Sequence, residues 1–174
     1  AHGQTMIAEV ANPGDPAAIR VSVRDHLERQ ARDRPARDFF ECIDTGRSIR
    51  FSEARDACNR IAALFSERGI GANDRVALLG ENSLEYVLLY LAVLRHGATL
   101  CALGAEMVGE HLSDILTAAN PRIVLYEAGI DLPEKRVPDT ADWIAYDRYP
   151  GNSDMGAAEF FHQAARFPAS PACE

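Results

Sequence analysis

Two short polar segments each follow an apolar run and carry most of the side chains that could meet a ligand. They are residues 80–85 and residues 104–110, and both lead into a helical pattern. A helix N-terminus attracts a phosphate by about 0.3–1 kcal/mol. A carboxylate about 4 Å from a phosphate charge opposes binding by about 4 kcal/mol at an effective dielectric constant near 20. Both segments contain carboxylates, so we predict that neither holds nucleotide phosphates unaided, and we interpret Glu81, Glu85 and Glu110 as first-turn residues that the helix dipole favours.

Other patterns that could indicate catalysis or metal binding fail on spacing. Ser83 lacks the flanking glycines of a nucleophile elbow and is interpreted as a helix N-cap. The Gly69-Ile70-Gly71 stretch precedes an apolar run instead of following one, which excludes a dinucleotide fingerprint. The histidines and cysteines show no spacing typical of a metal site. The four aspartates between residues 139 and 154 are interpreted as part of a solvent-exposed loop. These residues are His2, His26, His96, His111, His162, Cys42, Cys58, Cys101, Cys173, Asp139, Asp142, Asp147 and Asp154.

The elements that would position these segments alternate between helix and strand. A helix is expected from Ser52 to a stop at Gly69, because apolar residues recur there on one face. Further helices are expected after Ser22, over 84–94, over 110–119 and over 155–165; strands over 76–79, 99–103, 123–126 and 143–146; and a hairpin around the turn 44–47. This order predicts an α/β fold with a mostly parallel, doubly wound sheet flanked by helices and a short β-hairpin near the N-terminus.

Three parts of the chain are expected from these patterns. Residues 1–21 would form a flexible arm, residues 22–166 an α/β unit, and residues 167–174 a tail. Within the unit, the helix over 84–94 is apolar on nearly every side. Such a helix is either buried within the domain or covered by another protein surface, and both interpretations stay open at this point.

Composition narrows the class of protein further. The chain has 174 residues, of which 47% are hydrophobic, and a net charge of 18 − 26 = −8. That size fits one domain, and that charge disfavours nucleic acid and anionic membranes as partners. No apolar run is long enough to span a bilayer, and the cysteine spacing favours free thiols in the cytoplasm. Lys135 is the one lysine, so any lysine chemistry has a single candidate.

Four motifs in a fixed order resemble the front of the adenylate-forming acyl- and aryl-CoA synthetases. They are Ile49-Arg50-Phe51-Ser52-Glu53-Ala54, residues 69–77, residues 81–86 and residues 91–98. The resemblance implies a two-step ligase: a carboxylate and Mg-ATP give an acyl-adenylate and pyrophosphate, and a thiol such as that of CoA then displaces AMP. The loop that holds phosphate in that family, its nucleotide motifs and its catalytic lysine have no counterpart here, and the surroundings of Lys135 match none of them. The tail resembles the stretch just ahead of the phosphate loop.

We therefore expect an N-terminal fragment of an ATP-dependent acyl- or aryl-CoA ligase that is inactive alone, binds no cofactor alone and has no catalytic residue of its own. Its partners would be the remainder of the parent enzyme and, for the parent, a carboxylic acid; self-association stays open. Glu106 stands where some relatives carry an arginine for a phosphate of CoA, and it would repel that phosphate. The alternative is a free-standing, non-catalytic α/β module that binds a partner through the apolar helix over 84–94.

Overall fold

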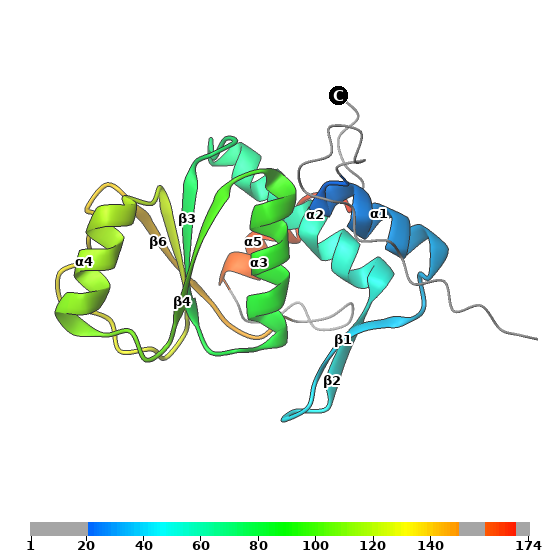
Figure 1. Cartoon of the computed structure of the whole chain (residues 1–174), viewed down its shortest axis with the longest axis horizontal. Helices are drawn as coiled ribbons and strands as arrows, with labels where there is room; N and C mark the ends of the chain where they lie inside the picture. Colours follow the sequence, from blue (N-terminus) through cyan, green and yellow to red (C-terminus); the bar gives the residue numbers. More distant parts are fainter. Residues whose placement is uncertain (1–20, 150–158, 170–174) are drawn as a thin grey trace, which may run out of the picture.

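A four-stranded parallel sheet forms the centre of the molecule (Figure 1). The computed structural model describes residues 21–149 and 159–169. The strands are β3 (Arg75–Gly80), β4 (Thr99–Gly104), β5 (Ile123–Glu127) and β6 (Asp142–Tyr146), in the spatial order β4-β3-β5-β6. All three neighbouring pairs are parallel. The predicted fold class, a doubly wound α/β sheet with an N-terminal hairpin, is confirmed.

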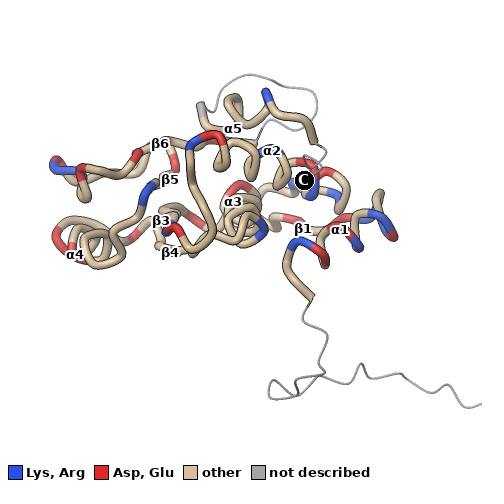
Figure 2. Tube along the Cα trace, turned by 90° about the horizontal axis from the view of Figure 1, so that it is seen from above, with Lys and Arg blue, Asp and Glu red and all other residues tan. Residues whose placement is uncertain are grey.

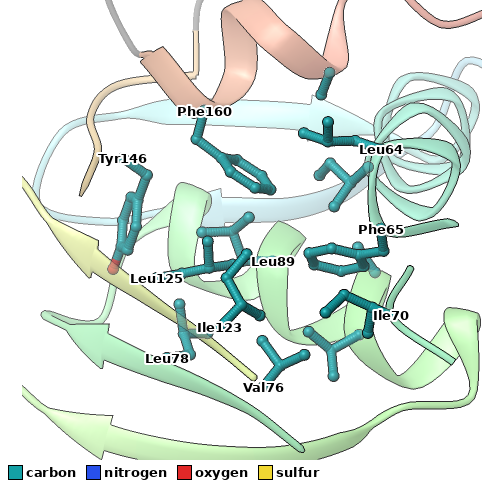
Figure 3. Close-up of a cluster of buried hydrophobic side chains, with 14 of the residues drawn as sticks. Leu64, Phe65, Ile70, Val76, Leu78, Leu89, Ile123, Leu125, Tyr146 and Phe160 are labelled. Carbon is teal, nitrogen blue, oxygen red and sulfur yellow. The ribbon is translucent and has the colours of Figure 1, made fainter. Parts of the chain in front are cut away.

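Helices cover both faces of this sheet. On one face lie α2 (Phe51–Glu67), α3 (Leu84–His96) and α5 (Glu159–Ala164); on the other lies α4 (Gly109–Ala119) (Figure 1). The central strand β3 is fully buried from Val76 to Leu79, as the absence of alternation in its sequence predicts. Leu78 faces the α3 side, where Phe65, Leu89 and Phe160 form the larger core (Figure 3). Its neighbours in sequence, Ala77 and Leu79, face α4.

The N-caps predicted at Ser22 and Ser83 and the helix end predicted at Gly97 are confirmed. The Ser22 hydroxyl accepts the Asp25 N–H at 3.0 Å at the start of α1 (Val23–Asp33), and the Ser83 hydroxyl accepts the Tyr86 N–H at 3.1 Å at the start of α3. Gly97 ends α3 with φ +85°, a conformation that glycine adopts without strain. The last predicted helix is present as α5; residues 155–158 of that prediction, with the arm 1–20 and the tail 170–174, lie outside the described residues.

The N-terminal elements pack beside α3 and α2. The hairpin joins β1 (Asp38–Cys42) to β2 (Arg47–Arg50) and projects from the body (Figure 1). On α1, the Glu28 carboxylate reaches Arg95 Nη2 of α3 at 3.2 Å and Arg55 Nη1 of α2 at 4.0 Å. Leu27 and Ala31 are the buried residues of α1, and Leu27 packs in the larger core beside these ion pairs.

The connection from β5 to β6 lies over the α4 side of the sheet. Its Arg136 places the guanidinium carbon 5.8 Å from the ring centre of Tyr126 and 5.7 Å from that of Trp143, a geometry typical of cation–π contact. Among the described residues, no helix has both the length and the apolar character needed to cross a bilayer.

Candidate functional site

The carboxyl ends of the strands form the edge at which a doubly wound sheet binds ligands. In the order β4-β3-β5-β6 the connections reverse direction between β3 and β5, and such switch points leave a crevice. A cleft of about 400 Å³ lies there. It is lined by Thr45, Arg47, Ser83, Glu85, Glu127, Tyr146, Asp147 and Arg148, which come from the hairpin, the start of α3 and the ends of β5 and β6.

The end of β3 is closed by the protein's own side chains. The Tyr146 hydroxyl donates to the Leu79 carbonyl at 3.3 Å, and the Glu127 carboxylate accepts the Glu81 N–H at 2.7 Å. A Cβ on Gly80 would overlap the Tyr146 hydroxyl and lie 3.1 Å from Glu127 Oε2, so only glycine allows this approach. Burial, assisted by the Glu127 charge, raises the pKa of Tyr146 above its ordinary value of 10.0, so the hydroxyl remains a donor into the alkaline range.

Glu85 is the most deeply buried carboxylate at this edge, with 7% of its side chain exposed. Its Oε1 lies 2.8 Å from Arg47 Nη1 and accepts the Tyr149 N–H at 2.6 Å. Arg47 Nη2 donates to the Tyr149 carbonyl at 3.0 Å. Glu85 is in the first turn of α3 as predicted, and its pairing with Arg47 joins the hairpin, α3 and the segment after β6.

Glu106 lies at the neighbouring position, after β4. Its carboxylate folds back over Gly104, where an added Cβ would overlap it. The Tyr86 hydroxyl lies 3.3 Å from the Leu103 carbonyl of β4 and 3.5 Å from the Leu78 carbonyl of β3, to either of which it can donate. Burial raises the pKa of Tyr86, and the Glu106 charge adds to this rise. Glu106 itself is exposed, and no contact with a ligand is shown for it.

The chemistry open to this edge is limited by its charges. The amide that a phosphate would use at the end of β3 is already bonded to Glu127, and Arg47 is paired with Glu85. The triphosphate of ATP therefore does not fit the residues that are present here, because carboxylates repel it. The Ser83 hydroxyl caps α3. Within residues 21–149 and 159–169, no three His, Cys, Asp or Glu side chains lie close enough to hold a metal ion.

Three residues of this edge were not predicted from the sequence, because their contacts join segments that lie far apart in the chain. Arg47, Tyr146 and Tyr149 reach the edge from segments far apart in the chain. The sequence could have indicated them only by their places, since Tyr146 is the last residue of a predicted strand and Arg47 is the last residue of a predicted turn. Of the loop aspartates, Asp147 lines the cleft and Asp142 pairs with Arg68 at 3.1 Å. Asp139 is exposed, and Asp154 lies outside the described residues.

Comparison with known proteins identifies relatives of the whole unit. A family model described as AMP-binding enzyme matches residues 27–167. The dimodular nonribosomal peptide synthase of Bacillus subtilis (strain 168) is 33% identical over 116 residues, which are 66% of this chain and 5% of that protein. The 4-hydroxybenzoate–CoA/benzoate–CoA ligase of Rhodopseudomonas palustris is 25% identical over 103 residues, covering 54% of this chain and 19% of the ligase.

The fold has solved counterparts. A Mycobacterium tuberculosis fatty acyl CoA synthetase superposes with a TM-score of 0.71 at 23% identity, covering 87% of this chain and 29% of that one. The chain thus spans less than a third of the length of each of these three relatives. The family that the four ordered motifs predicted is confirmed, and this chain belongs to the AMP-binding enzyme family.

Proposed function

We propose that this chain is the N-terminal α/β part of an ATP-dependent acid–thiol ligase. In the parent enzyme, the carboxylate of an acid attacks the α-phosphorus of Mg-ATP, pyrophosphate leaves, and a thiol then displaces AMP to form a thioester. The observation that carries the proposal is the family match over residues 27–167. The parent would work in the cytoplasm with Mg-ATP and, as acceptor, CoA.

The 174-residue chain alone would supply structure without catalysis. In support of this, Tyr146 and Glu127 close the end of β3, and the carboxylates that line the neighbouring cleft would oppose the phosphates of ATP. We expect the purified chain to exchange no labelled pyrophosphate into ATP with aryl, fatty or amino acids. The parent enzyme, assayed in parallel, should exchange with one of these classes. Exchange by the chain alone would overturn the proposed inactivity, and a parent that exchanges with no acid would overturn the ligase.

The thiol acceptor is a separate part of the proposal, because the relatives include a CoA ligase and a peptide synthase. Glu106 lies on the exposed side of the loop after β4, and its charge would oppose a phosphate of CoA there. We expect Glu106→Arg in the parent to lower the KM for CoA several-fold and to leave pyrophosphate exchange unchanged. Glu110→Arg, also exposed but on α4, is the matched control. An unchanged KM in the Glu106 variant would remove this residue from the CoA site.

A second function is favoured by one observation on α3. Tyr90 is 40% exposed, while Val87, Leu91 and Leu94 are only half-buried, so this apolar helix is not fully covered by the described residues. A free-standing module that binds a partner through α3 would also explain this surface. Reading the coding sequence past Glu174 separates the two, because only the ligase requires a Ser/Thr/Gly-rich loop that ends in lysine.

A further inference from the structure

Asn59 is a buried polar residue in the middle of α2. The apolar stripe of this helix leaves Asn59 on the polar side with Asp56 and Arg60, yet only 4% of the residue is exposed. Among the described residues, Glu85 is the other polar residue buried to this depth, and its carboxylate is paired with Arg47. Burying a polar side chain is unfavourable unless hydrogen bonds compensate for the lost water. The partners of Asn59 therefore indicate why it lies there.

The partner of Asn59 is the chain that leaves α5. Helix α5 packs against α2 (Figure 2), and the chain after it continues through Phe167, which packs against the larger core. Two residues later, the Asn59 Nδ2–H donates to the Ala169 carbonyl at 2.5 Å. The two residues are 110 positions apart in the sequence, so this bond fixes the place at which the chain leaves the described unit.

The other half of the Asn59 amide is unused within the described part of the chain. Its Oδ1 is buried and has no hydrogen-bond partner there. A buried amide oxygen without a donor is unfavourable, so such an atom marks a place where a further group is expected. Oδ1 and Nδ2 belong to one planar amide, and a donor that reaches Oδ1 therefore lies close to the Ala169 carbonyl. The nearest source of such a donor along the chain is the segment that continues from Ala169.

We propose that Asn59 is a positioning residue that fixes the start of the phosphate-binding loop in the parent enzyme. This rests on the proposed function, because it is the ligase that requires such a loop beyond Glu174. Asn59 acts through the backbone: Nδ2 holds the Ala169 carbonyl, and Oδ1 accepts a donor of the continuing chain. A loop whose start shifts would meet the phosphates of ATP at altered distances, and a misplacement of about 1 Å can lower a rate about 100-fold.

Replacement of Asn59 in the parent tests this role. Asn59→Leu keeps the size of the side chain and removes both hydrogen-bonding groups. In pyrophosphate exchange with the acid that the parent activates, the KM for Mg-ATP should rise about 10-fold or more, while the KM for the acid stays within about twofold. Thioester formation from preformed acyl-adenylate, which carries no pyrophosphate, should keep its rate. Ile61→Val, at another buried position of α2, is the matched control; it should lower Tm and leave both KM values unchanged.

Hydrogen exchange in the parent gives a readout that does not depend on activity. In Asn59→Leu the backbone amides that follow Ala169 should exchange at least about 10-fold faster, and those of β3 should be unchanged. If the leucine variant does not fold, Asn59→Ser, whose side chain ends nearer to the helix, replaces it in the same assays.

The possible outcomes separate this inference from the proposed function. An active parent whose KM for Mg-ATP is unchanged by Asn59→Leu would overturn the inference and leave the ligase intact. Equal losses in adenylate formation and thioester formation would also overturn it, because they indicate general destabilisation. A parent that activates no acid would overturn the proposed function; in that protein, unchanged exchange after Ala169 would overturn the positioning role as well, and faster exchange would support it.

Discussion

Gly80 is the residue on which packing at the carboxyl edge depends most directly. We expect Gly80→Ala to destabilise the chain by about 1–3 kcal/mol, because its Cβ would overlap the buried Tyr146 hydroxyl. Chemical denaturation measures the loss. Gly71→Ala is the control, since its Cβ would meet only Asp74 Oδ2 at an ordinary 3.6 Å.

The same overlap predicts non-additivity. In the Tyr146→Phe background the hydroxyl is gone, so Gly80→Ala should be less destabilising there than in the unchanged chain. Equal losses in both backgrounds would contradict the assignment of the clash to that oxygen.

At the residue scale, what could be predicted was local. Ser22 and Ser83 were predicted as caps because an N-cap bonds to an amide three residues away. The partners of Glu85 could not be predicted, since Arg47 and Tyr149 lie far from it in sequence and no short spacing encodes the contact. Sequence therefore predicted that the edge is rich in carboxylates but not that Glu85 is already paired with Arg47.

At the element scale, one carboxylate of α1, that of Glu28, pairs with arginines of both neighbouring helices. Removing Glu28 leaves the Arg95 guanidinium, whose side chain is only 6% exposed, without its carboxylate. We expect Glu28→Ala to destabilise the chain by about 1–3 kcal/mol and to speed amide exchange along α1. Glu67→Ala, at an exposed position of α2, should leave both unchanged.

A double variant separates this ion pair from simple loss of packing. Adding Arg95→Met to Glu28→Ala removes the buried charge that the single change leaves behind, so part of the stability should return. If the double variant is as unstable as the sum of the two single changes, the pair is not what attaches α1.

The helices and strands themselves were largely predictable, because apolar periodicity and helix caps depend on residues that are close together in the sequence. Helix α3 shows the limit. Its sequence is apolar on all sides, but whether its outer side is covered depends on surfaces that this sequence does not contain. The strand order could not be predicted either, because the alternation of helices and strands predicts parallel strands but does not determine which strands are adjacent in the sheet.

At the scale of the whole molecule, buried acids limit stability at high pH. Burial raises the pKa of the Cys58 thiol from its ordinary value of 9.0 to about 12, and burial also raises the pKa of Tyr149. The folded chain thus keeps a proton that the unfolded chain releases above pH 9, so the free energy of unfolding should fall as pH rises from about 9 to 12. Cys58→Ala removes one such proton, and its curve should be shallower by up to about 1.4 kcal/mol per pH unit. Denaturant titrations at several pH values provide the test, and parallel curves would contradict it.

The stacking of Arg136 on Trp143 has a practical consequence, because Trp143 is the only tryptophan in the chain. Intrinsic fluorescence excited at the indole band therefore reports a single location, on β6 at the far end of the sheet from β4. Its emission should shift when the domain unfolds, because the indole then loses its contacts with Arg136 and Tyr126. One optical signal can thus follow unfolding at a known place in the sheet without an added dye.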